Sequence, residues 1–226
     1  MVDQQSRPRP RWLVLGLALS LGVTILSATF LLWVTAGRNA ATELPDLATM
    51  PAFQLTDQEG LTVTADQYRG KVLLVGFIYT NCDDICPMLT AQMRSLQEDL
   101  QSAGLLGEAQ LLSISVDPEV DTPAVLREYA AGYGVDTTTW RFLTGEVDHV
   151  RKVVVEGFLL GYQQVPAAGG HAGHGGTTDT ADYRVEHSGR IALVDQAGTI
   201  RAYYDGTELD RERVIREVRT LVTKAR

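Results

Sequence analysis

Apolar positions form three kinds of pattern along the chain, and each predicts a different element. One uncharged run covers residues 12–36, and as a helix of 1.5 Å per residue it would reach about 37 Å, enough to cross a hydrocarbon core of roughly 30 Å. The shorter apolar runs Val72–Tyr79 and Leu111–Val116 are typical of strands buried on both faces. Stripes of apolar residues at helical spacing predict helices from Pro87 to about Ala103 and from Glu208 to Lys224.

The segments between these elements complete an alternation of strands and helices. The further predicted elements are a hairpin turning at Asp57–Gly60, a helix from Thr122 to about Tyr133, a short strand at Phe142–Leu143, a helix over Glu146–Glu156, a strand over Leu159–Val165 and a hairpin of Ile191–Val194 with Thr199–Tyr204. Alternating strands and helices, closed by a hairpin and a helix, predict a thioredoxin-like α/β sandwich.

The predicted organisation has four parts. Residues 1–11 precede the apolar run, residues 12–36 form a transmembrane helix, residues 37–50 are a polar tether, and residues 51–226 form one thioredoxin-like domain. Inside that domain, residues 167–181 are rich in Gly, Thr and His and are predicted to be a flexible inserted loop.

The apolar run is interpreted as an uncleaved anchor. It is longer than the roughly 7–15 apolar residues of a signal peptide, and no clear Ala-x-Ala site follows it. Arg7, Arg9 and Arg11 precede it, so the positive-inside rule places the amino terminus in the cytoplasm and exports the domain. These features predict a single-pass protein of the bacterial inner membrane with its carboxy-terminal domain in the periplasm.

The charge of the chain argues against nucleic acid as a partner. The chain has 20 Lys and Arg against 28 Asp and Glu, a net charge of −8. Without the three amino-terminal arginines and Asp3, the exported part carries a net charge of about −10, and such a surface repels phosphate backbones.

The chain contains two cysteines, Cys82 and Cys86, and they follow a predicted buried strand at the start of a predicted helix. Two residues four apart on a helix lie on one face, with Cα atoms roughly 6 Å apart. Sulfur atoms at that separation can close a disulfide or hold one soft metal ion together.

Three interpretations of the cysteine pair follow. A structural disulfide is disfavoured, because closing a loop of about five residues stabilises a fold by only about 2 kcal/mol in the chain-entropy model. A thiol–disulfide oxidoreductase fits the position, since a helix amino terminus stabilises thiolate. However, the spacer is one residue longer than Cys-x-x-Cys, and no proline directly precedes Ile191.

A copper site is the favoured interpretation. Two thiolates suit Cu(I), and an imidazole suits both Cu(I) and Cu(II). A third ligand should come from a distant segment that folds beside the first turn of the helix. His187 is the best candidate, because it precedes the strand at Ile191, at the sheet edge where functional residues gather in α/β folds. Zinc is less favoured, since a structural zinc site needs four ligands.

Other polar and sulfur side chains are accessory candidates. Asp117 ends a buried strand at the same edge of the sheet and is expected chiefly to close the turn that follows. His171 and His174, in the Gly-rich loop, are expected to gather copper weakly if at all. Met88 and Met93 follow the cysteines along the helix and are predicted to pack in the core.

Several separate motifs together resemble the SCO/SenC proteins, a family of membrane-anchored copper chaperones for cytochrome c oxidase assembly. The motifs are Asn81–Pro87, Ser115–Pro123, Trp140 with Leu143–Gly145, and Asp182–Ser188 followed by Leu193–Asp195. The resemblance implies a thioredoxin fold and a copper site made by Cys82, Cys86 and His187. It also implies that copper goes to the binuclear copper centre of oxidase subunit II.

The expected function is therefore that of a copper chaperone, without catalytic turnover in the ordinary sense. It would need a periplasmic copper donor and a thiol reductant as partners. The alternative is a thiol–disulfide reductase that keeps the cysteines of subunit II reduced. A peroxidase of the peroxiredoxin type is disfavoured, because Thr80 stands two residues before Cys82 rather than three, and no distant resolving cysteine exists.

Overall fold

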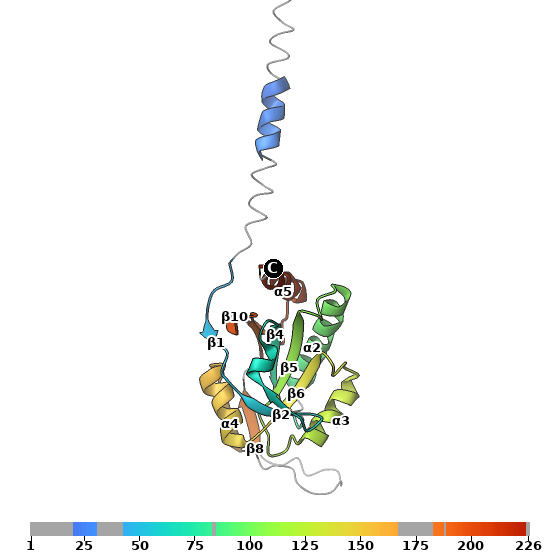
Figure 1. Ribbon diagram of the computed structural model, residues 1–226, viewed down its shortest axis with the longest axis vertical. Helices are drawn as coiled ribbons and strands as arrows, with labels where there is room; N and C mark the ends of the chain where they lie inside the picture. The colour runs from blue at the N-terminus through green and yellow to red at the C-terminus, as the bar shows by residue number, and fades with distance from the viewer. Residues whose placement is uncertain (1–19, 31–42, 83–84, 167–182, 188, 225–226) are drawn as a thin grey trace, which may run out of the picture. The chain divides into compact units, whose positions relative to one another are not determined.

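The computed structural model describes residues 20–30, 43–82, 85–166, 183–187 and 189–224 (Figure 1). The chain divides into two compact units, Met1–Glu43 and Leu44–Arg226. In the first unit, residues 20–30 are helical. Within the described residues, no helix combines the length and the apolar character needed to cross a membrane. The span expected over residues 12–36 is described only in its middle, so the anchor stays a prediction.

The second unit is built on a mixed sheet of eight strands in the order β1-β10-β9-β4-β5-β6-β2-β3. β4, β5 and β6 run parallel, and the other neighbours in this sheet are antiparallel. The strands are β1 (Ala48–Thr49), β2 (Gln54–Asp57), β3 (Thr62–Thr64), β4 (Val72–Ile78), β5 (Ala109–Ser115), β6 (Trp140–Thr144), β9 (Arg190–Val194) and β10 (Thr199–Asp205). Both predicted hairpins and the three predicted inner strands are thereby confirmed.

A second, two-stranded sheet stands apart from this one. β7 (Tyr162–Pro166) pairs antiparallel with β8 (Tyr183–His187), and Tyr162 lies opposite His187. A strand had been predicted near β7, whereas β8 was not predicted. The residues between these strands, including His171 and His174, lie outside the described residues.

Helices cover both faces of the main sheet. They are α2 (Ile85–Ser102), α3 (Pro123–Tyr133), α4 (Val147–Lys152) and α5 (Arg211–Lys224), with a 3-10 turn η1 (Ala65–Tyr68) and a π-helical turn η2 (Val153–Gly157). Side-chain atoms of Met93 in α2 lie 3.6–3.7 Å from where a Cβ of Gly76 would stand. The ring of the next residue, Phe77, meets Phe158 at 5.1 Å. Because successive side chains of a strand point to opposite faces, α2 and the segment after η2 cover opposite faces of β4.

The residues of the core coincide with the apolar patterns of the sequence. All seven residues of β4 are buried, as expected for a strand covered on both sides. The apolar part of the buried face of α2 consists of Cys86, Leu89, Met93, Leu96 and Leu100. Each fully buried aliphatic side chain of this size stabilises the fold by about 1.5–3 kcal/mol. Cys86 thus belongs to the packed face of the helix.

The packed domain begins inside the segment that was expected to be a tether, residues 37–50. The guanidinium of Arg201 donates to the carbonyl oxygen of Leu44 and pairs with Asp46 and Asp195. The backbone N–H of Leu47 donates to Ile200 O at 3.0 Å, and β1 continues this pairing with β10. Residues 44–50 are therefore part of the packed domain.

The helix expected over residues 146–156 changes its winding half-way. Glu146 caps the start of α4 by accepting from the N–H groups of Asp148 and His149, and the α-helix gives way to η2 after Lys152. At its end, a Cβ on Gly157 would stand 2.2 Å from Cγ of Pro51, so the close approach of Pro51 requires glycine there. Leu159 follows with a positive φ of 55° and is 63% exposed.

Candidate metal centre

Cys82 and Cys86 lie at the junction between the end of β4 and the start of α2. Cys82 follows the carboxyl end of β4 and is 7% exposed, while Cys86 occupies the first turn of α2 and is fully buried. The two sulfurs are not joined in a disulfide, and the two side chains share a hydrogen bond. The structure therefore brings the two predicted sulfur ligands together in one buried place.

The surroundings of Cys86 keep it protonated in the absence of a metal. Its hydrogen bond with Cys82 raises the pKa of the Cys86 thiol, and burial raises it further, because the charged thiolate loses its hydration. A hydrogen bond from the backbone of Tyr79 acts in the opposite direction and lowers the pKa. Copper binding at this pair would have to displace protons from the sulfurs.

A carboxylate that was not considered as a site residue lies beside the pair. Asp121 is fully buried and accepts hydrogen bonds from Thr80 and Ser115, both at the carboxyl ends of neighbouring strands. Burial raises the pKa of Asp121, and the hydrogen bonds from Ser115 and Thr80 lower it. The available signal was a second aspartate four residues after Asp117, just before the start of α3.

Asp117 itself closes the turn after β5, as predicted. Its carbonyl oxygen accepts from the N–H of Val120 at 3.1 Å and from that of Asp121 at 2.9 Å, while its own N–H donates to Ser115 Oγ at 3.0 Å. The charge of Asp117 also raises the pKa of Asp121. Asp117 thus contributes to the site by closing the turn that holds Asp121 in its buried position.

His187 is placed by its backbone. It is the last residue of β8, and two residues later the chain packs against the first turn of α2, since a Cβ on Gly189 would stand 3.1 Å from Cδ1 of Ile85. Consecutive Cα atoms are 3.8 Å apart, so the His187 backbone is less than about 8 Å from Gly189. Among the described side chains, no three or more His, Cys, Asp or Glu gather in a metal-binding arrangement, and the third ligand stays a prediction.

The two methionines of α2 have different environments. Met93 is 1% exposed and packs against Gly76, which confirms its predicted place in the core. Met88 is 42% exposed, so its predicted burial is wrong. Leu89, the next residue, takes the buried position instead, because each residue of a helix is rotated by about 100° from the last.

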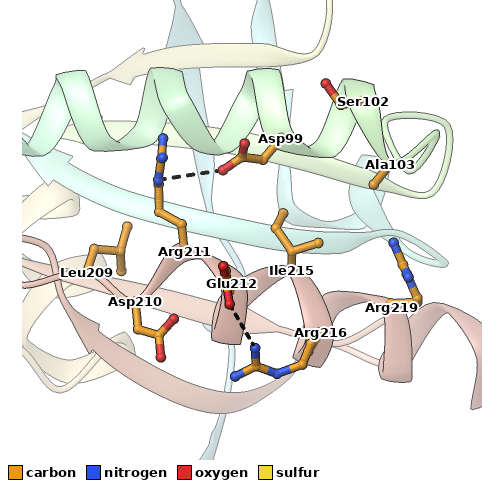
Figure 2. A pocket seen from close by; sticks show the side chains of 10 residues that line it. All are labelled: Asp99, Ser102, Ala103, Leu209, Asp210, Arg211, Glu212, Ile215, Arg216 and Arg219. Atoms are coloured by element: carbon orange, nitrogen blue, oxygen red, sulfur yellow. Dashed lines mark ion pairs between the residues drawn. The ribbon is translucent and has the colours of Figure 1, made fainter.

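A groove of about 730 Å³ lies between the far half of α2 and α5 (Figure 2). Its walls carry charges of both signs, with Arg211 3.6 Å from Asp99 and Arg216 3.7 Å from Glu212. Neither cysteine lines it. The groove is separate from the thiol pair and has none of the soft ligands that the sequence predicts for the site.

Comparison with known proteins agrees with this arrangement. The profile of the SCO1/SenC family matches residues 41–223. The "SCO1 protein homolog" of Bacillus subtilis (strain 168) is 41% identical over 93 residues, which make up 41% of this chain and 47% of that protein. The matched part thus spans about half the length of that relative.

Two solved structures share the fold and carry informative descriptions. BsSco, a member of the Sco family of cytochrome c oxidase assembly proteins with a disulfide switch, has a TM-score of 0.63 and 29% identity over 78% of this chain and 94% of its own. ScoI of Bradyrhizobium japonicum with copper bound has a TM-score of 0.63 and 26% identity over 77% of this chain and 99% of its own. With the profile match over nearly the whole second unit, the chain belongs to the SCO1/SenC family.

Proposed function

We propose that this protein is a copper chaperone that binds one copper ion through Cys82, Cys86 and His187 and delivers it to the binuclear copper centre of cytochrome c oxidase subunit II. The hydrogen-bonded pair of buried thiols at the start of α2 carries this proposal. Copper bound to the related ScoI of Bradyrhizobium japonicum supports the choice of metal.

The donor set suits copper in both oxidation states. Two thiolates can hold Cu(I) in linear geometry, whereas Cu(II) prefers additional ligands, nitrogen included. Each sulfur gives up its proton on binding, so loading with Cu(I) releases two protons and leaves a complex of charge −1. With Cu(II) the two thiolates and the ion are neutral together. His187 would complete the site in the second state.

A second function rests on the same thiols. The two sulfurs are close enough to share a hydrogen bond, and the related BsSco has a disulfide switch. A thiol–disulfide reductase that keeps the cysteines of subunit II reduced would use this pair without metal. In that reaction the Cys82–Cys86 disulfide forms while the disulfide of subunit II receives two electrons and two protons.

The proposed setting is the bacterial inner membrane. The uncharged run at residues 12–36 would anchor the chain, with the domain in the periplasm. Exported thiols oxidise readily, and a disulfide offers no thiolate to a metal. The protein therefore needs a thiol reductant before loading and a copper donor in the same compartment.

Two mixtures distinguish delivery from reduction. In the first, copper-free reduced protein meets an oxidised soluble fragment of subunit II. In the second, copper-loaded protein meets the reduced fragment. We expect copper transfer in the second mixture and no thiol exchange in the first, measured by metal analysis of the separated proteins and by thiol alkylation with mass spectrometry.

The opposite pair of results would support the thiol–disulfide reductase as the function. Thiol exchange in the first mixture, with all copper retained by this protein in the second, would overturn delivery as the function. A fragment of subunit II that lacks its two cysteines is the control, because it should neither receive copper nor exchange thiols.

The histidine ligand can be tested separately. Replacement of His187 by alanine should lower the affinity for Cu(II) at least about tenfold more than the affinity for Cu(I), because Cu(I) keeps its two thiolates. Chelator competition with each ion measures both affinities on the full-length protein.

The loop histidines provide the matched control. Joint replacement of His171 and His174 by alanine should remove only weak additional copper uptake. Loss of the principal site in this double variant, together with retention in His187→Ala, would show that a loop histidine is the third ligand.

A further inference from the structure

The carboxylate of Asp121 is buried without a charged hydrogen-bond donor among the described residues. Its donors are the N–H of Thr80, 3.2 Å from both carboxylate oxygens, the hydroxyl of Thr80 at 2.5 Å from Oδ1 and the hydroxyl of Ser115 at 2.5 Å from Oδ2. Its residue is 0% exposed. Burying a carboxylate costs several kcal/mol even when neighbouring dipoles compensate, so simple packing does not account for it.

These donors tie the carboxylate to the backbone that leads into the thiol pair. Thr80 is two residues before Cys82, and its neighbour Tyr79 directs its backbone to the sulfur of Cys86. Two consecutive residues are therefore held from two sides, Tyr79 by Cys86 and Thr80 by Asp121. The strand that supplies Ser115 is also held, since Val116 N donates to Ile78 O at 2.8 Å. Asp121 thus fixes the ends of β4 and β5 around the sulfurs.

The same carboxylate lies near the sulfurs, because it is hydrogen-bonded to Thr80, two residues before Cys82, and to Ser115, the last residue of the neighbouring strand β5. Two thiolates with Cu(II) are neutral, whereas two thiolates with Cu(I) carry one negative charge. A nearby buried anion therefore disfavours the Cu(I) complex and leaves the Cu(II) complex nearly unaffected.

From these contacts we infer that Asp121 is a positioning residue of the thiol pair, holding the Tyr79–Thr80 backbone in place, and that its charge selects Cu(II) over Cu(I) at the site. The inference rests on the proposed copper binding by Cys82 and Cys86. It assigns the oxidation-state preference of the site to a residue that is not a metal ligand.

Replacement of Asp121 by asparagine tests the inference, because it removes the charge and keeps the size of the side chain. In the full-length protein, the ratio of Cu(I) affinity to Cu(II) affinity should rise about tenfold, which equals a rise of 59 mV in the one-electron midpoint potential. Chelator competition gives the ratio, and a redox titration of the copper-loaded protein gives the potential independently.

The positioning role has a readout that needs no metal. In the reduced, copper-free protein, Asp121→Asn should speed hydrogen exchange at the amide of Thr80, which loses its charged acceptor. Asp121→Glu keeps the charge, so its affinity ratio should stay near that of the unmodified protein even if the longer side chain weakens binding of both ions.

Asp57→Asn is the matched control. Asp57 is also 0% exposed, but it lies on β2, three strands from β4, and pairs with Arg141. Its replacement removes a buried carboxylate without reaching the thiols, so the protein should lose stability and keep its affinity ratio. This control separates a local effect of charge from a general effect of destabilisation.

The outcomes distinguish this inference from the proposed function. An unmodified protein that binds no copper would refute the copper site itself. An unmodified protein that binds copper, with an Asp121→Asn variant whose affinity ratio is unchanged, would refute only the role of Asp121. If Asp121→Asn does not fold, Asp121→Ser provides the same measurement, since it removes the charge and leaves room for water.

Discussion

Replacement of Cys82 or Cys86 by serine is expected to abolish tight copper binding. A hydroxyl is a poor ligand for Cu(I), and the remaining thiolate cannot hold the ion alone. The loss should far exceed the roughly 10–100-fold that removal of an outer partner of a metal site costs. Competition with a chromogenic Cu(I) chelator measures the affinity, and metal analysis after desalting measures the stoichiometry, expected to fall from one copper per chain to none.

Met88→Leu is the control for this experiment. It removes the other sulfur from the first two turns of α2, yet Met88 is 42% exposed and does not share the buried face of Cys86. The variant should bind copper as the unmodified protein does. Full Cu(I) affinity in either serine variant would contradict the proposed site.

Replacement of Phe158 by alanine is expected to produce a large loss of stability. Phe158 is fully buried, its ring packs edge-on against Phe77, and its carbonyl oxygen accepts from the hydroxyl of Tyr203 at 2.7 Å. Truncation of a buried phenylalanine costs about 3–5 kcal/mol. For a domain of this size, the melting temperature should fall by roughly 10 °C.

The neighbouring residue supplies the comparison. Leu159→Ala removes a side chain that is 63% exposed, and such changes usually stay within about 0.5 kcal/mol. Circular dichroism during heating compares the two variants under the same conditions. Equal melting temperatures for both would show that the contact between Phe158 and Phe77 contributes little.

The buried strands and the thiol pair could be predicted because their patterns are long or chemically distinctive. β4 is apolar at every position, and covering on both faces is what makes such a strand recognisable. The chain contains two cysteines, and both closely follow that strand. Burial of the stripe through Leu89 and Met93 follows the helical period.

The features that were missed have no pattern of their own. β1 is two residues long and pairs with β10, a strand near the other end of the chain, whose Arg201 donates to the carbonyl oxygen of Leu44. Asp117 and Asp121 are the same residue type, so the sequence does not distinguish them. The turn between them, in which Asp121 N donates to Asp117 O, decides which carboxylate reaches Thr80. Tertiary contacts therefore determined both, and local sequence could not.

The contacts of Arg201 with Leu44 and Asp46, at the start of the domain, have a mechanical consequence. Ala48 lies opposite Ile200, which lies opposite Val194, which in turn lies opposite Leu73 near the beginning of β4. The cysteines follow the other end of β4. A pull on the chain ahead of Leu44 would therefore load the Arg201 contacts and the pairing of β1 with β10 first, at the opposite end of the sheet from the sulfurs. The thiol pair is therefore at the end of the sheet that tension from the amino-terminal side of the domain reaches last.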